Sequence, residues 1–152
     1  MKRRANDKNP NLGLQQVISN DEEETFALAE EMASGFKGNE VVCLSGELGA
    51  GKTVFAKGLA AGLGLKNTAQ VCSPSFTIIN IYQARCTIFH IDLYRLGKES
   101  EIAELGLEDY LDEGVLIIEW AEKMERIPGS ILINITMLEN DKRRIKITQA
   151  IV

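Results

Sequence analysis

Residues 46–53 have the types and spacing of a phosphate-binding loop, because they complete the pattern G-x-x-x-x-G-K-T. The segment reads Gly46, Glu47, Leu48, Gly49, Ala50, Gly51, Lys52 and Thr53. Its glycines let the backbone turn tightly and bring N–H groups close to phosphate oxygens. Lys52 can place its charge on the β- and γ-phosphates of a nucleotide, and the Thr53 hydroxyl can ligate Mg²⁺. The segment therefore predicts a nucleotide site that uses all eight residues.

The segments on either side have the structure that such a loop requires. Before the loop, residues 41–44 form the apolar run Val-Val-Cys-Leu, which is typical of a buried strand. After the loop, Phe55, Leu59 and Leu63 are four residues apart, as on one face of a helix. We therefore predict a strand, the loop and a helix in that order, with the positive end of the helix facing the phosphates.

Two acidic residues close apolar, strand-like runs and are candidates for the remaining chemistry. Asp92 follows Thr-Ile-Phe-His-Ile, and Glu119 follows Val-Leu-Ile-Ile. Nucleotide hydrolysis needs an acid at a strand end beside the loop, to hold Mg²⁺ and its waters. Alternation along the first run would put His90, Asp92 and Tyr94 on one face if the strand runs that far. Taken alone, each acid could also be a strand end that meets solvent, and His90 a strand residue with a satisfied hydrogen bond.

The polar segment Ser73-Pro-Ser-Phe-Thr77 offers three hydroxyl groups after the helix that follows the loop. Nucleotide-sensing loops occupy this place in many phosphate-loop proteins and contribute a hydroxyl to Mg²⁺ or the γ-phosphate. Ser75 is our candidate for that contact. Taken alone, the same segment could be an ordinary turn.

The other patterns predict the scaffold that must position these residues. Ser19 and Glu22 have the spacing of a capping box and predict the start of a helix that ends near Gly35. Further elements are predicted at residues 76–82 and 86–92 (an antiparallel hairpin), 99–105 and 107–111 (helical), and 115–118, 130–138 and 143–148 (strands). Together these elements predict an α/β fold, with a P-loop NTPase-like mixed β-sheet that is flanked by helices and contains antiparallel hairpins. We expect one domain over residues 13–152, after a flexible tail at residues 1–12.

Composition narrows the partners and the compartment. The net charge of -5 argues against a chain that holds nucleic acid by its own charge, since that binding needs a basic surface. The three cysteines are far apart and there is one histidine, so a zinc site is not expected. An odd number of cysteines is most simply explained by a reducing cytoplasm, and no apolar run approaches the length of a membrane span.

Four segments together resemble the TsaE family (formerly YjeE) of small bacterial P-loop ATPases. They are residues 46–53, Ser73-Pro-Ser-Phe-Thr77, Phe89-His-Ile-Asp-Leu-Tyr-Arg95 and Ile118-Glu-Trp-Ala-Glu122. The resemblance runs from about residue 19 to residue 148. It implies Mg-dependent ATP binding and hydrolysis, slow in the chain alone, in support of the TsaD and TsaB proteins. That complex makes threonylcarbamoyladenosine at position 37 of tRNA, and the resemblance implies contact with tRNA only through the complex.

The family's site residues can be transferred to matching positions. Lys52 and Thr53 are implied to bind phosphate and Mg²⁺, and Asp92 and Glu119 to serve Mg²⁺ and hydrolysis. The chain departs from the usual family pattern at two places. It has Ser75 where the family usually has Thr, which keeps the hydroxyl but loses a methyl that restricts the rotamer. It has Ala121 where the family usually has Pro after Glu-Trp.

Two other functions compete with this interpretation. A small-molecule kinase usually has an arginine-bearing lid, whereas the arginines after the loop are scattered at Arg85, Arg95, Arg126, Arg143 and Arg144. A nucleotide-gated binding module, whose hydrolysis is incidental, would carry the same motifs as an ATPase. A GTPase is disfavoured because the chain has no Asn-Lys-x-Asp to recognise guanine.

Overall fold

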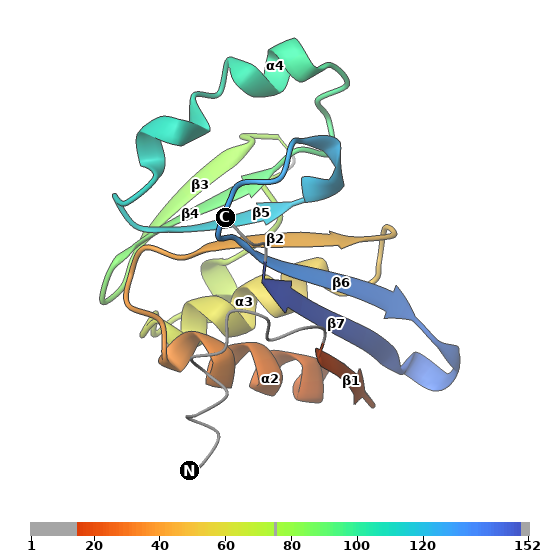
Figure 1. Cartoon of the computed structure of the whole chain (residues 1–152). Helices are drawn as coiled ribbons and strands as arrows, with labels where there is room; N and C mark the ends of the chain where they lie inside the picture. Colours follow the sequence, from red (N-terminus) through yellow and green to blue (C-terminus); the bar gives the residue numbers. More distant parts are fainter. Residues whose placement is uncertain (1–14, 75, 150–152) are drawn as a thin grey trace.

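The computed structural model describes residues 15–74 and 76–149, and within them seven strands form one mixed sheet (Figure 1). The strands are β1 (Gln15–Ser19), β2 (Val41–Gly46), β3 (Ile79–Gln83), β4 (Thr87–Asp92), β5 (Val115–Glu119), β6 (Ile131–Met137) and β7 (Arg143–Gln149). Their order across the sheet is β1-β7-β6-β2-β5-β4-β3. The predicted tail at residues 1–12 and the candidate Ser75 lie outside the described residues.

The centre of the sheet is parallel and its two edges are antiparallel. Strands β6, β2, β5 and β4 run in one direction, whereas β3 pairs antiparallel with β4 and β7 pairs antiparallel with both β6 and β1. The apolar runs of β2 and β5 explain their central position, since parallel strands are buried on both faces. The predicted α/β fold with a mixed sheet and antiparallel hairpins is confirmed.

Helices cover both faces of this sheet. Helices α2 (Glu22–Ser34) and α3 (Lys52–Gly62) lie on one face, and α4 (Glu99–Ala103) lies on the other (Figure 1). Four short 3-10 turns complete the described part, at Thr68–Gln70, Leu107–Tyr110, Ala121–Lys123 and Glu139–Asp141. Because side chains alternate along a strand, Ile117 packs in the cluster of α2 and α3, whereas Ile118 packs in the cluster that contains Ile102 of α4. Every second residue of β5, counted from Ile117, therefore faces α3.

Three predicted boundaries are wrong, and a competing cap and a left-handed residue explain the first two of them. Helix α2 is capped by Asp21, whose carboxylate accepts from the Glu24 N–H at 2.8 Å, and the predicted cap Ser19 instead ends β1. Strand β1 was not predicted from the sequence. Strand β3 begins at Ile79 rather than Phe76, because Ile78 adopts a left-handed conformation with φ 71° that interrupts extension. Helix α4 ends at Ala103 rather than residue 105.

Two glycines inside or at the end of α3 allow it to pack closely on α2. A Cβ on Gly58 would lie 2.4 Å from the carbonyl oxygen of Phe26 and 2.7 Å from the Cβ of Ala29. A Cβ on Gly62 would lie 2.3 Å from the carbonyl oxygen of Glu30. Glycine is unfavourable in a helix interior, so its presence at Gly58 reflects this contact. The helix that follows the phosphate-binding loop is therefore held in place from behind by α2.

We expect Gly58→Ala to lower the free energy of unfolding by about 1–2 kcal/mol. Alanine has a higher helix propensity than glycine by about 1 kcal/mol, so a helix free of contacts would become more stable. Here the added methyl group meets backbone atoms of α2 that cannot rotate away. Urea unfolding measures the change, with Gly97→Ala as the control because a Cβ there meets nothing within 4 Å. A Gly58→Ala variant as stable as the parent would contradict the close packing.

Among residues 15–74 and 76–149, no helix combines the length and the apolar character that a membrane crossing requires.

Candidate nucleotide-binding site

The phosphate-binding loop connects the end of β2 to the start of α3, as predicted. Gly46, Gly49 and Gly51 all adopt positive φ, at 147°, 82° and 112°. Gly46 also lies against β6, where an added Cβ would be 2.5 Å from the carbonyl oxygen of Ile135. Side chains other than glycine rarely adopt these conformations, so the loop shape requires glycine at these positions.

Lys52 folds back over the loop. Its Nζ donates to the carbonyl oxygens of Gly46 at 2.6 Å and Glu47 at 2.9 Å, and lies 4.0 Å from the centre of the Trp120 ring. The side chain is only 5% exposed. Burial lowers the pKa of the Lys52 amine, and the nearby carboxylates of Glu119, Glu122 and Asp92 oppose that shift. A desolvated cation of this kind would gain stability from an incoming anion.

The two candidate acids lie side by side at the carboxyl ends of neighbouring parallel strands. Asp92 of β4 and Glu119 of β5 are directly paired in the sheet register. Their exposed fractions are 3% and 2%, so neither is a strand end that simply meets solvent. The alternation of β5 turns Glu119 to the face that carries α3, where Thr53 lies in the first turn of the helix. The fold therefore brings Thr53, Asp92 and Glu119 together, although they are far apart in the sequence.

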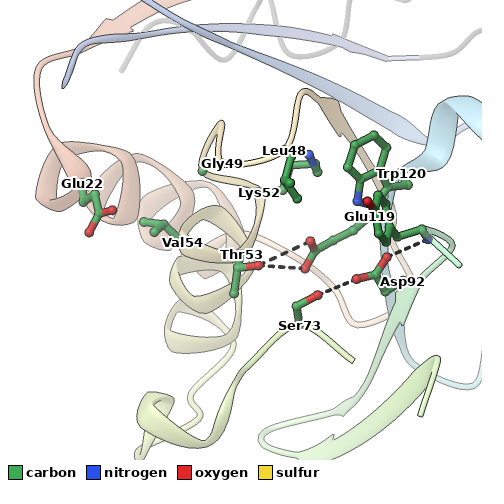
Figure 2. A pocket seen from close by; sticks show the side chains of 12 residues that line it. Glu22, Leu48, Gly49, Lys52, Thr53, Val54, Ser73, Asp92, Glu119 and Trp120 are labelled. Atoms are coloured by element: carbon green, nitrogen blue, oxygen red, sulfur yellow. Dashed lines mark hydrogen bonds between the residues drawn. The ribbon is translucent and has the colours of Figure 1, made fainter. Parts of the chain in front are cut away.

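The Asp92 carboxylate is held by two donors. The Ser73 hydroxyl donates to Oδ2, and the Tyr94 backbone N–H donates to Oδ1 at 2.8 Å (Figure 2). Strand β4 ends at Asp92, so Tyr94 does not continue the face of the strand as the alternation suggested. Ser73 is a contact that the sequence reasoning did not single out, since it chose Ser75 from the same segment.

The Glu119 carboxylate faces both the helix and the sheet. The Thr53 hydroxyl is 3.4 Å from each of its oxygens (Figure 2). On the other side, Nε2 of His90 is 2.6 Å from Oε2 of Glu119. The prediction that His90 is a strand residue with a hydrogen bond is confirmed, and its partner is the candidate catalytic acid.

An open pocket of about 380 Å³ collects most of these groups, which is within the range of small-molecule sites. It is lined by Glu22, Leu48, Gly49, Gly51, Lys52, Thr53, Val54, Ser73, Asp92, Tyr94, Glu119 and Trp120. The other predicted loop residues do not line it. Gly46 closes β2, the Glu47 side chain is exposed and Ala50 is fully buried. Figure 2 shows Thr53, Asp92 and Glu119 facing one another across this space.

Arg143 supports the loop from behind and was missed as a site residue. Its Nε donates to the Ala50 carbonyl oxygen at 2.8 Å, and its Nη1 donates to the Asp141 carbonyl oxygen at 2.7 Å. The residue begins β7 and is 8% exposed. A charged side chain buried to this degree needs partners, and here the loop backbone is one of them. From the sequence, Arg143 was one of several scattered arginines, and no local pattern connects it to a loop 93 residues earlier.

Hard oxygen donors are the ligands that Mg²⁺ prefers, and Thr53, Asp92 and Glu119 supply them. Among the described residues, no group of three or more histidine, cysteine, aspartate or glutamate side chains could hold a metal ion. Three oxygen donors from the protein would leave the remaining positions of an octahedral Mg²⁺ ion to other oxygen ligands, such as water. This donor set does not resemble a closed cage made by the protein alone.

A family model described as "Threonylcarbamoyl adenosine biosynthesis protein TsaE" matches residues 19–146. The chain belongs to the TsaE family. The family resemblance found in the four motifs is thereby confirmed. Glu119, Asp92 and the phosphate-binding loop all lie inside the matched region.

Individual relatives agree with this assignment. A protein of Aquifex aeolicus named tRNA threonylcarbamoyladenosine biosynthesis protein TsaE is 42% identical over 135 residues, which cover 88% of this chain and 96% of that protein. The protein of the same name from Bacillus subtilis is 44% identical over 130 residues, covering 83% of this chain and 80% of that protein. A crystal structure of Bacillus subtilis YdiB is similar with a TM-score of 0.74 and 33% identity, covering 92% of this chain and 87% of that one.

Proposed function

We propose that this chain is a Mg-dependent ATPase that supports the TsaB–TsaD complex in forming threonylcarbamoyladenosine at position 37 of tRNA. One observation carries the ATPase part of the proposal. The phosphate-binding loop faces two buried carboxylates, Asp92 and Glu119, which are paired at the ends of parallel strands. Membership of the TsaE family supports the pathway.

Five residues of the pocket and the backbone of the loop have tasks in this proposal. The loop N–H groups and Lys52 bind the phosphates, because the backbone turns inward and the cation is already desolvated. Thr53, Asp92 and Glu119 would hold Mg²⁺, and a bound Mg²⁺ would supply positive charge beside the β- and γ-phosphates. Glu119 also orients the attacking water, since among the described residues its Oε1 accepts a single long contact, from Thr53 at 3.4 Å. Ser73 keeps the Asp92 carboxylate turned toward the pocket.

The acidic charge of the chain suggests that it acts on tRNA through partners. Its net charge of -5 argues against holding the phosphate backbone by its own charge at physiological salt. TsaB and TsaD would supply the contact with tRNA, and ATP would control how this chain associates with them. A nucleotide-gated binding module is the competing function, because the same pocket could bind ATP and change the adjoining surface without needing turnover.

The decisive experiment measures ATP hydrolysis by the purified chain alone and with TsaB, TsaD and tRNA, each added in turn. We expect slow hydrolysis alone, faster hydrolysis with the two partner proteins, and no tRNA binding by the isolated chain. Binding titrations with ATP, ADP and a non-hydrolysable ATP analogue separate the two functions. If the analogue supports full tRNA modification over many cycles, the chain is a gated binding module. If no mixture binds or hydrolyses ATP, the proposal is wrong.

We expect Arg143→Met to weaken ATP binding about threefold to tenfold, or ~0.5–1.5 kcal/mol. Methionine fills similar space but removes the donors to Ala50 and Asp141, so the loop loses a support behind its backbone. Calorimetric titration with ATP measures the effect. Arg144→Met is the matched control, because Arg144 is the next residue and its side chain alternates to the other face of β7. Equal affinities in the two variants would show that Arg143 only stabilises the fold.

A further inference from the structure

His90 is a buried polar residue behind the pocket for which the proposed function has no task. It lies in the middle of β4 with an exposed fraction of 0%. Its Nε2 atom is 2.6 Å from Oε2 of Glu119, and the two side chains are 1% and 3% exposed. Polar groups this deeply buried are costly unless they are hydrogen-bonded, so this contact is a strong constraint on both side chains.

The direction of the hydrogen bond follows from the chemistry of the two groups. An ionised carboxylate only accepts hydrogen bonds, so the Nε2 atom of His90 must carry the proton. The other ring nitrogen, Nδ1, has no hydrogen-bond partner among the described residues. An unprotonated Nδ1 is the less costly form, since an N–H at this atom would be a buried donor without an acceptor. Both nitrogens therefore favour the tautomer with the proton on Nε2.

This contact fixes which part of the Glu119 carboxylate faces the pocket. The sheet register pairs Glu119 with Asp92, while His90 sits two residues before Asp92 on the same face of β4. His90 therefore contacts Glu119 from the interior of the protein, and its Nε2 atom hydrogen-bonds to Oε2. The remaining contacts of the carboxylate are the long ones from Thr53, at 3.4 Å. Without His90, the carboxylate would keep no short hydrogen bond to any residue that the structure describes and could rotate.

We propose that His90 is a positioning residue that holds the Glu119 carboxylate toward Thr53 and the pocket through an Nε2–H donor. The inference rests on the proposed role of Glu119 in ATP hydrolysis. Groups that hydrogen-bond to ligating or reacting side chains orient them, and removing such a group typically costs about 10–100-fold in activity or metal affinity. His90 itself does not touch the nucleotide.

The kinetic test compares His90→Leu with His90→Gln. Leucine fills the buried space without a donor, so we expect kcat for ATP hydrolysis to fall about tenfold while KM for ATP changes less than about twofold. Glutamine can place an amide donor near the position of Nε2, so it should recover most of kcat. Ile88→Val is the control, because Ile88 is fully buried two residues earlier on the same face of β4. It should lower the melting temperature and leave kcat unchanged.

The spectroscopic test observes the His90 ring directly, so it needs no turnover. The chain contains a single histidine, so the imidazole signals belong to His90. We expect the ¹⁵N spectrum of the folded protein to show one protonated nitrogen, Nε2, and one unprotonated nitrogen, Nδ1. In Glu119→Ala this pattern should shift or collapse into a tautomer mixture, whereas in Glu122→Ala it should not.

Each result bears on one proposal or the other. A protonated Nδ1, or a His90 spectrum that is identical in Glu119→Ala, would overturn the inference. So would a folded His90→Leu variant that hydrolyses ATP at the parent rate. If His90→Leu does not fold, His90→Gln and the spectra decide. If the parent chain hydrolyses no ATP under any condition, the proposed function fails, and the spectra still decide whether His90 orients Glu119.

Discussion

Glu119→Gln is expected to lower the turnover number for ATP about a hundredfold, or ~2.7 kcal/mol of barrier. Glutamine keeps the size of the side chain and an oxygen that can accept from His90 Nε2 and Thr53, so the variant removes charge and leaves the geometry. Glu119 is 2% exposed and lies beside the phosphate-binding loop. A charge buried in this way is poorly screened. Single-turnover and steady-state kinetics with the partner proteins present measure the change.

A Glu→Gln substitution at an exposed residue serves as the control. Glu122→Gln removes a carboxylate three residues further on, at an exposed position near Lys52, and should leave turnover within about twofold. Asp92→Ala should also lower turnover by at least about tenfold, since it removes the second buried carboxylate of the pocket, which would help to hold Mg²⁺. If either Glu119→Gln or Asp92→Ala hydrolyses ATP at the normal rate within the complex, that residue only ends its strand.

Lys52→Ala is expected to weaken ATP binding by about tenfold to a hundredfold, or ~1.5–3 kcal/mol. The Lys52 amine already lies over the loop, held by the carbonyls of Gly46 and Glu47, so little ordering is needed when phosphate arrives. Burial lowers the pKa of the amine, and an anion beside it would favour the charged form. The attraction between the two charges is strong at this site because a buried charge is poorly screened. Isothermal titration calorimetry with ATP in the presence of Mg²⁺ gives the affinity.

The control for Lys52 is Lys57→Ala, one turn further along α3 and less buried. It removes the same charge from the same helix and should leave ATP affinity within about twofold. Thermal unfolding of both variants separates binding from folding, since the Lys52 amine also satisfies two loop carbonyls. An unchanged ATP affinity in a folded Lys52→Ala variant would rule out the phosphate-binding role of the loop.

Short stretches of sequence determined much of this protein, because the information in them is local. The loop at residues 46–53 requires glycine at positive φ, and that requirement can be read from three residue types and their spacing. The apolar runs of β2 and β5 predicted buried strands, and the short link between β3 and β4 predicted a hairpin. The strand ends at Asp92 and Glu119 were also predictable. The prediction failed at the start of α2, where both Ser19 and Asp21 can serve as the N-cap of the helix.

Only the tertiary structure decided which of these residues meet. Sheet register, which no pattern within one strand specifies, places Glu119 beside Asp92. The chain reversal between β6 and β7 brings Arg143 to the carbonyl of Ala50, 93 residues away. The close approach of α2 to Gly58 likewise depends on two helices packed on one face. These contacts join segments distant in sequence, so their energies depend on the whole fold. The pairing of His90 with Glu119 is of the same kind, since it exists only once β4 and β5 lie side by side.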